Sequence, residues 1–417
     1  MWRPIDVNSW VDKRRGELRN VQSSVKDIIE MVRTQGDDAL FELTERFDKV
    51  RLSSLRISEE EVEAAYEMVD PPLIKELRKA AGNIERFHKM QLDAQNWITE
   101  VEPGIVLGVR LLPMHRIGAY VPGGRAAYPS TALMCVIPAK VAGVEEIVVC
   151  TPPSVNPLTL VALDIAGADE VFQLGGAQAV AAMAWGTPTI RKVGKVVGPG
   201  NIFVTEAKLQ LRDQVEIDFP AGPSEVLVIA DEGADPRFVA ADILAQAEHD
   251  PSSACLLVTT SMALAEKVGH EVERGAFISP RKDIVQQSLR NAGYVIVRDL
   301  EEAAAVSDRI APEHLSVQTR DPLGTLGLIH SAGSIFLGPF SPVAAGDYAT
   351  GTNHVLPTAG YPSLLSGLDV RHFCKATSIQ KLEKEGLERL APTIEGLANA
   401  EGLVEHARSV RVRLEKG

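Results

Sequence analysis

Apolar positions in the first hundred residues repeat with the spacing of amphipathic helices. One set recurs at helical intervals and defines a single buried face: Val25, Ile28, Ile29 and Val32. After a break at Gly36, Ala39, Leu40 and Leu43 continue the pattern. Two further helices are predicted over residues 59–69 and 74–91, and Pro71 and Pro72 stop the first of them. This part of the chain is therefore expected to be mostly helical.

From about Arg116 the pattern changes to short apolar runs that end in Gly or Pro and alternate with Ala-rich helical segments. A first series of runs covers residues 117–121, 146–150, 171–174 and 195–197, and a second covers 225–230, 254–259, 294–297 and 334–337. Continuous apolar strands separated by helices are typical of parallel sheets that are covered on both faces. The fold class predicted is α/β, with two doubly wound parallel-sheet domains and helical extensions at both ends.

These patterns also predict how the chain divides into domains. Residues 1–20 are expected to form an N-terminal arm, and residues 117–224 an inserted α/β domain. A larger, discontinuous α/β domain is expected to combine 21–116 with 225–370. The tail, 371–417, is charged and helical in pattern, and its composition is that of a surface arm or a dimer element.

Composition excludes several classes of partner. Of 417 residues, 45% are apolar and 24% charged, which is ordinary for a globular enzyme. The net charge of −13 argues against nucleic acid or an anionic membrane as a standing partner. No apolar run is long enough to cross a bilayer, and the four cysteines form no closely spaced pair. A cytoplasmic protein with reduced thiols is expected.

Proton chemistry is concentrated in two polar stretches, 311–316 and 345–354. In the first, Glu313 stands beside His314, and Pro312 disfavours a helix at Ala311, so we expect the pair on a turn. The second stretch is rich in Gly and contains Asp347 and His354. A solvated loop would explain the Glu-His dipeptide alone, but other stretches of the chain strengthen a catalytic interpretation.

A metal site is predicted near the end of a helix that begins at Asp235 and Pro236. Gln246 and His249 are three residues apart, so we expect them to share one face of this helix. With Asp347 they would form a mixed oxygen and nitrogen set, which suits Zn²⁺ or Mn²⁺ with open positions. Taken alone, a His at a helix end is more often a packed residue, and this spacing is a weak signal.

Three Gly-rich turns follow predicted strands, at residues 120–125, 174–179 and 197–201. Such turns allow backbone N–H groups to approach a diphosphate, so a dinucleotide is plausible. The usual GxGxxG fingerprint is missing, because Phe203 stands where its third Gly would be. Ser224 lies at the expected domain junction, where it suits a substrate contact or a hinge better than a nucleophile.

Together these stretches resemble the histidinol dehydrogenase family. The matching motifs occur in the family's order at residues 117–124, 175–179, 197–201, 221–227, 246–250, 311–315 and 351–358. The resemblance implies Rossmann-like domains and a homodimer. It also implies NAD-dependent oxidation of L-histidinol to L-histidine through histidinaldehyde, with one zinc ion per subunit.

The resemblance further implies a role for individual residues. Glu313 and His314 match the acid/base pair, and Tyr120, Gln178 and Asn201 match NAD contacts. The implied zinc ligands are Gln246, His249, Asp347 and His406. The implied substrate contacts are Ser224, His354 and Glu401, together with His314 and the four zinc ligands. Glu401 and His406 would come from the partner subunit, so that the tail, 371–417, crosses the dimer.

Two other enzyme classes remain open from the residues alone. A zinc hydrolase could use Gln246, His249, Asp347 and Glu313 for a metal-bound water and its base. A related dehydrogenase for another small alcohol, such as a sulfonated diol, is the second alternative, although the stretch 353–357 favours histidinol. A non-catalytic structural role is the least favoured, because every polar position that the chemistry requires is present.

Overall fold

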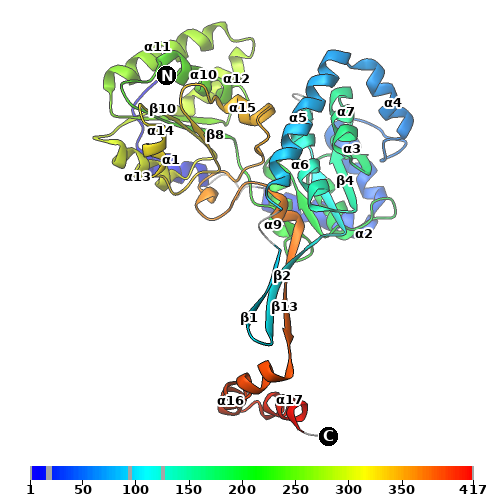
Figure 1. Ribbon diagram of the computed structural model, residues 1–417. Coiled ribbons are helices and arrows are strands. Elements are labelled where there is room, and N and C mark those ends of the chain that lie inside the picture. The colour runs from blue at the N-terminus through cyan, green and yellow to red at the C-terminus, as the bar shows by residue number, and fades with distance from the viewer. Residues whose placement is uncertain (1, 16–20, 93–95, 124–126, 416–417) are drawn as a thin grey trace.

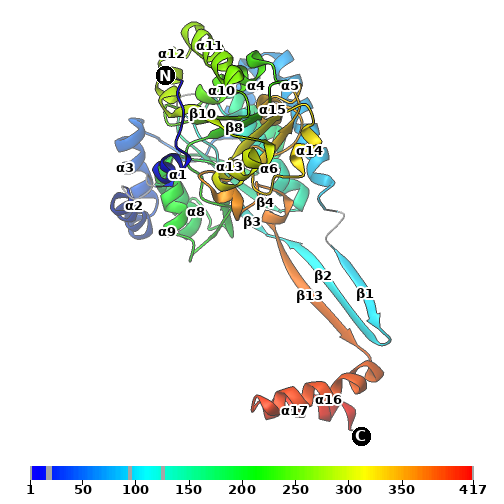
Figure 2. The same ribbon diagram turned by 90° about the vertical axis from the view of Figure 1, so that its left-hand side faces the viewer.

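Two parallel sheets and a projecting arm organise the chain. The computed structural model describes residues 2–15, 21–92, 96–123 and 127–415, and the two sheets form separate lobes that lie side by side (Figure 1). The arm extends from the junction of the lobes and ends in two helices (Figures 1 and 2). The predicted α/β class with two doubly wound domains is confirmed.

The first lobe is built on a sheet with the order β5-β4-β3-β6-β7, all parallel. Its strands are β3 (Arg116–Tyr120), β4 (Glu146–Thr151), β5 (Glu170–Gln173), β6 (Lys195–Val197) and β7 (Glu216–Ile217). Its helices are α2 (Gln22–Gln35), α3 (Asp37–Asp48), α4 (Glu59–Met68), α5 (Pro71–Lys89), α6 (Pro129–Ala142), α7 (Pro157–Ala166), α8 (Gly176–Trp185) and α9 (Ile202–Gln210).

The second lobe repeats this topology with the order β10-β9-β8-β11-β12. Its strands are β8 (Glu225–Ala230), β9 (Ala254–Thr259), β10 (Ala292–Ile296), β11 (His314–Gln318) and β12 (Ser334–Leu337). Its helices are α1 (Val7–Arg15), α10 (Pro236–Ala247), α11 (Met262–Ile278), α12 (Lys282–Ser288), α13 (Leu300–Ile310), α14 (Pro322–Leu326) and α15 (Val343–Tyr348), with the 3₁₀ turn η2 (Leu289–Asn291). Of two later 3₁₀ turns, η3 (Tyr361–Ser363) and η4 (Val370–Phe373), the second packs against α6 in the core of the first lobe. In each sheet the first strand is central and the fourth lies beside it, which is the Rossmann order over five strands.

The N-terminal segment belongs to the second lobe. Residues 3–5 run along the edge strand β10, where Ile5 N–H donates to Tyr294 O (2.9 Å) and Tyr294 N–H donates to Arg3 O (3.0 Å). The helix α1 then packs apolar side chains, among them Trp10, on the core beneath β8 and β11. Residues 1 and 16–20 of the predicted arm lie outside the described part of the chain.

The helices of residues 21–116 pack differently from our expectation. We grouped them with residues 225–370, but α2 contacts α8 and α9, α4 contacts α7, and α5 contacts α6. Their buried residues, such as Val25 and Ile84, share hydrophobic cores with the strands of the first lobe. Helical periodicity shows which face of these helices is buried, but it does not show which sheet covers that face.

The arm is a three-stranded antiparallel sheet followed by two helices. Its elements are β1 (Trp97–Glu102), β2 (Ile105–Pro113), β13 (Cys374–Leu382), α16 (Lys384–Ala400) and α17 (Val404–Leu414), with the sheet order β1-β2-β13. The tail, predicted to be helical from Arg371, therefore begins with a strand, because β13 pairs with β2 along its whole length. Among the described residues, no helix is both long and apolar enough to span a membrane.

Candidate active site

The Glu-His pair lies at the amino edge of the second sheet. Helix α13 ends at Ala311, whose backbone is left-handed (φ 48°), and His314 is already the first residue of β11. The predicted turn thus holds for residues 311–313, whereas His314 is held in the sheet, opposite Val226 of β8 and Ser334 of β12. Two-sided pairing fixes the backbone of His314.

Glu225, the first residue of β8, makes polar contacts with both members of this pair. Its N–H donates to Glu313 Oε2 (2.8 Å), and its carbonyl oxygen lies 3.2 Å from His314 Nδ1. The Glu313 carboxylate is also 3.4 Å from Nδ1. Because both of these neighbours are acceptors, Nδ1 carries a proton, and His314 Nε2 is left to face Asp347 Oδ1 at 3.6 Å.

Charged neighbours in this buried cluster oppose the effect of desolvation on the pKa values of His314 and Asp347. Burial by itself would lower the pKa of His314, but the carboxylates of Glu313 and Asp347 raise that pKa well above its ordinary value. Burial favours the neutral form of Asp347, yet its contact with His314 and the nearby His354 and His249 lower its pKa. The site therefore stabilises an imidazolium between two carboxylates.

The predicted metal ligands Gln246 and His249 lie at the carboxyl end of α10, which packs against α15, the helix that carries Asp347. Helix α10, capped by the Asp235 side chain, ends at Ala247, so Gln246 lies in its last turn. His249 lies beyond the helix, and its N–H donates to Gln246 O at 3.3 Å. The prediction that both residues share one helix face is therefore wrong, because the helix ends before His249. A tight turn after the helix keeps the two residues close.

The donor chemistry of this region fits a metal ion. The Gln246 side chain is 2% exposed, and neither its amide oxygen nor its amide nitrogen has a hydrogen-bond partner among the described residues. Such an orphaned buried amide is costly unless a ligand satisfies it. One amide oxygen, one imidazole and one carboxylate suit Zn²⁺ or Mn²⁺ with open positions. Within the described chain no three His, Cys, Asp or Glu side chains form a metal-binding group.

The residues predicted to contact NAD lie at the carboxyl edge of the first sheet. Tyr120 ends β3, and its hydroxyl accepts a hydrogen bond from Gly176 N–H (3.1 Å) at the start of α8, which also carries the buried Gln178. Asn201 follows β6 and caps α9. Tyr120 and Asn201 thus lie at the carboxyl ends of the two neighbouring strands where the strand order reverses, the place at which dinucleotides bind in this topology. Gly124 and Arg125 of the first predicted turn lie outside the described residues.

Residues 353–360 connect the two lobes beside the Glu313-His314 pair. His354 Nδ1 lies 2.8 Å from Asp347 O, and its Nε2 lies 3.2 Å from Thr131 Oγ1 of α6. Asn353 donates to Met134 O, also in α6, at 2.8 Å. Ser224 directly precedes Glu225, whose backbone contacts both Glu313 and His314.

The last two predicted residues are not brought to this site. Glu401 follows α16 and His406 lies in α17, and both residues are exposed. These helices stand at the far end of the arm from both lobes in each view (Figures 1 and 2). Within one chain, His406 therefore does not join Gln246, His249 and Asp347.

Sequence reasoning missed two buried carboxylates. Glu225 was part of a matching motif but received no role, although a charged residue at the start of an apolar strand is a usable signal. Asp242 lies one helical turn before Gln246, and its carboxylate accepts hydrogen bonds from Ser316 Oγ and Gln318 Nε2, both at 3.1 Å. It also accepts from Val343 N–H at 3.4 Å, so it ties α10 to β11 and α15.

Comparison with known proteins shows the family to which the chain is similar. The family described as histidinol dehydrogenase matches residues 11–414. Proteins named histidinol dehydrogenase from Methanosarcina barkeri and Methanothermobacter thermautotrophicus are 54% and 52% identical, covering 96% and 98% of this chain and 93% and 97% of their own lengths. The crystal structure of histidinol dehydrogenase from Elizabethkingia anophelis is 40% identical and covers 99% of this chain and 94% of that one, with a TM-score of 0.92.

The turn after β6 provides a direct test of the first-lobe site. Gly198 has φ 108°, and a methyl group there would collide with the Tyr120 carbonyl oxygen. We expect Gly198→Ala to lower the free energy of unfolding by about 1–3 kcal/mol from backbone strain alone. Gly82→Ala is the control, since nothing lies within 4 Å of its added methyl group in α5. Equal thermal stability of the two variants would contradict the prediction.

Proposed function

Since this chain belongs to the histidinol dehydrogenase family, the oxidoreductase of histidine biosynthesis, we propose that it oxidises L-histidinol to L-histidine through histidinaldehyde with two NAD⁺ and one zinc ion per subunit. The observation that carries this proposal is the buried group of Glu313, His314 and Asp347, together with the unpartnered amide of Gln246 on α10, which packs against the helix of Asp347. A general base, a candidate metal set and the loop that reaches the first lobe meet there.

Gln246, His249 and Asp347 would hold the zinc ion, with His406 of a second subunit as the fourth ligand. When bound, the ion would orient the amino and imidazole nitrogens of histidinol and offset the charge of Asp347. With that charge offset, His314 can be neutral. Its Nδ1–H keeps donating a hydrogen bond to the Glu225 carbonyl oxygen, so Nε2 is the atom that accepts the hydroxyl proton of the alcohol.

NAD⁺ would bind at the carboxyl edge of the first sheet, near Tyr120, Gln178 and Asn201, and would accept one hydride in each of the two oxidations. The aldehyde must be hydrated before the second oxidation. Glu313 is suited to remove a proton from that water, because its Oε2 is held by Glu225 N–H while it remains beside His314. His314 would then serve the proton transfer of both steps.

We also propose a homodimer in which each tail completes the other subunit's site. The arm exposes large apolar side chains that are costly to leave in water, including Trp97 (49% exposed), Ile98 (63%), Leu397 (63%) and Val404 (58%). It also carries Glu401 and His406, which have no catalytic neighbours in their own chain's arm. A second copy of the chain would cover the apolar surface and bring both residues to a site that lacks them.

Removal of the metal should abolish turnover. We expect dialysis against a chelator to stop NADH formation from histidinol, and Zn²⁺ or Mn²⁺ to restore it, because the donor set suits both ions. Absorbance at 340 nm follows the reaction, and elemental analysis follows the metal. Full turnover by protein shown to be metal-free would rule out the proposed zinc site.

The two oxidations should separate on mutation. Glu313→Gln should retain alcohol oxidation and slow aldehyde oxidation, because only the second step needs an activated water. His314→Asn should impair both steps by about two to four orders of magnitude, because proton transfer is lost. Single-turnover rates with histidinol and with histidinaldehyde measure each step. Equal losses in both steps for a folded Glu313→Gln variant would contradict this division of roles.

Complementation tests the shared site. A chain truncated before Ala400 should fold but lose zinc and activity, because one ligand is missing. Mixed dimers of His314→Asn and His406→Asn protomers should regain activity, since one of their two sites has both residues intact. The matched control is each variant alone, which should stay inactive. Inactive heterodimers, once shown to have formed, would mean that the tail serves no partner site.

A further inference from the structure

A buried ion pair joins the N-terminal helix to the catalytic strand pair. Arg14 of α1 places Nε 2.6 Å from Glu225 Oε2, with side-chain exposures of 10% and 1%. Neither atom has a hydrogen-bond partner among the described residues, so each depends on the other's charge. Arg14 also donates to Pro223 O at 2.8 Å, and its guanidinium carbon lies 5.0 Å from the centre of the Trp10 ring.

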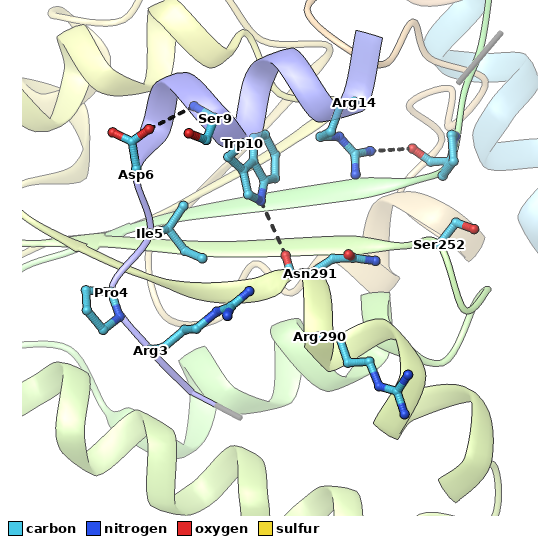
Figure 3. A pocket seen from close by; sticks show the side chains of 11 residues that line it. Arg3, Pro4, Ile5, Asp6, Ser9, Trp10, Arg14, Ser252, Arg290 and Asn291 are labelled. Carbon is cyan, nitrogen blue, oxygen red and sulfur yellow. Dashed lines mark hydrogen bonds between the residues drawn. The ribbon is translucent and has the colours of Figure 1, made fainter. Parts of the chain in front are cut away.

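These contacts fix how α1 lies on the second lobe. Trp10 Nε1 donates to Asn291 O at 3.3 Å, and Figure 3 shows Trp10 and Arg14 projecting from α1 toward the pocket beneath it. Arg14 reaches the end of this pocket nearest Pro223, two residues before Glu225. The N-terminal segment thereby contributes a buried positive charge to the amino edge of the sheet.

The carboxylate of Glu225 acts on the catalytic residues through its second oxygen. Oε1 accepts Glu313 N–H at 3.3 Å and Ala359 N–H at 2.9 Å. The backbone of Glu225 in turn binds the Glu313 carboxylate and His314 Nδ1. Ala359 has φ 55°, an uncommon conformation for a residue with a side chain, and the hydrogen bond helps to hold it. One side chain therefore positions Glu313 and the end of loop 353–360.

Burial makes this arrangement dependent on Arg14. Desolvation raises the pKa of Glu225, and the charge of Arg14 opposes that shift. Without Arg14, a carboxylate buried between β8 and Glu313 would have to become protonated or rotate away. Either response weakens the acceptor that holds Glu313 N–H and Ala359 N–H.

We propose that Arg14 and Glu225 are positioning residues that keep Glu313 and His314 aligned for catalysis, so that docking of the N-terminal helix is required for turnover. The inference rests on the proposed catalytic roles of Glu313 and His314. It goes beyond those roles by assigning a task to the N-terminal segment, which contributes no side chain to the proposed metal, NAD or substrate contacts.

The test compares two ways of removing the buried charge pair in the zinc-loaded, full-length protein. Arg14→Met should lower kcat with histidinol by about tenfold or more, within the range of coupling between contacting residues, while the KM for NAD⁺ is unchanged. Adding Glu225→Gln should recover most of the lost kcat. The uncharged amide oxygen can still accept the hydrogen bonds from Glu313 N–H and Ala359 N–H. Adding Glu225→Leu instead should restore stability but not kcat.

The matched control is Arg3→Met, which removes an equal charge from the same segment without touching Glu225 and should leave kcat unchanged. Unaltered kcat in Arg14→Met, or equal recovery in both double variants, would overturn the proposal and leave the pair a purely structural one. If Arg14→Met does not fold, the double variants still decide, since neither contains an unpaired buried charge. Full activity of Glu313→Gln and His314→Asn would instead refute the underlying catalytic roles.

Discussion

The register between β8 and β11 is the constraint on which the rest of the site depends. The first pair between these two strands is His314 with Val226. Glu313 and Glu225 each come one residue earlier, and the register therefore places them beside each other. A slip of one residue would turn every side chain of β11 to the other face of the sheet. The apolar residues Leu315 and Val317 are fully buried on one face, so such a slip is strongly disfavoured. The packing of the core thus holds the Glu313-His314 pair, the proposed proton-transfer group, in position.

The two lobes share a topology but use opposite edges of their sheets. In the first lobe the proposed NAD contacts lie at the carboxyl edge, at the loops that follow β3 and β6 and at the start of α8. In the second lobe the proposed catalytic pair lies at the amino edge, where Glu225 is the first residue of β8 and Glu313 directly precedes β11. Loop 353–360 links these edges through His354 and Thr131, and Gly222 N–H donates to Thr358 Oγ1 at 2.5 Å. Hydride acceptor and proton acceptor can therefore come from different lobes.

Buried charge is the physical feature common to the site and its supports. Asp242, Glu225, Glu313 and Asp347 are all carboxylates with little solvent access, and each is held by specific hydrogen-bond donors or by a cation. Such networks are favourable only when every member is satisfied. Ser316, Gln318 and Val343 satisfy Asp242, while Arg14 and Ala359 serve Glu225. The Gln246 amide is unsatisfied within the described chain, which is consistent with a ligand as its missing partner.

The sequence by itself determined the elements whose signal is local. The apolar runs at 225–230, 254–259 and 334–337 became β8, β9 and β12 with those same bounds, because a continuous apolar run is buried wherever a covered parallel strand forms. Strand β11 was not predicted, because Ser316 and Gln318 interrupt its apolar pattern. These buried polar side chains are satisfied by hydrogen bonds that they donate to Asp242, which lies 74 and 76 positions away in the sequence. The arm strands were missed because their mostly exposed side chains show no burial period. The resemblance of the motifs named the site residues. The packing of residues 21–116 on the first lobe and the ion pair of Arg14 with Glu225 depend on contacts between segments that are distant in the sequence. Only the tertiary structure decided those contacts.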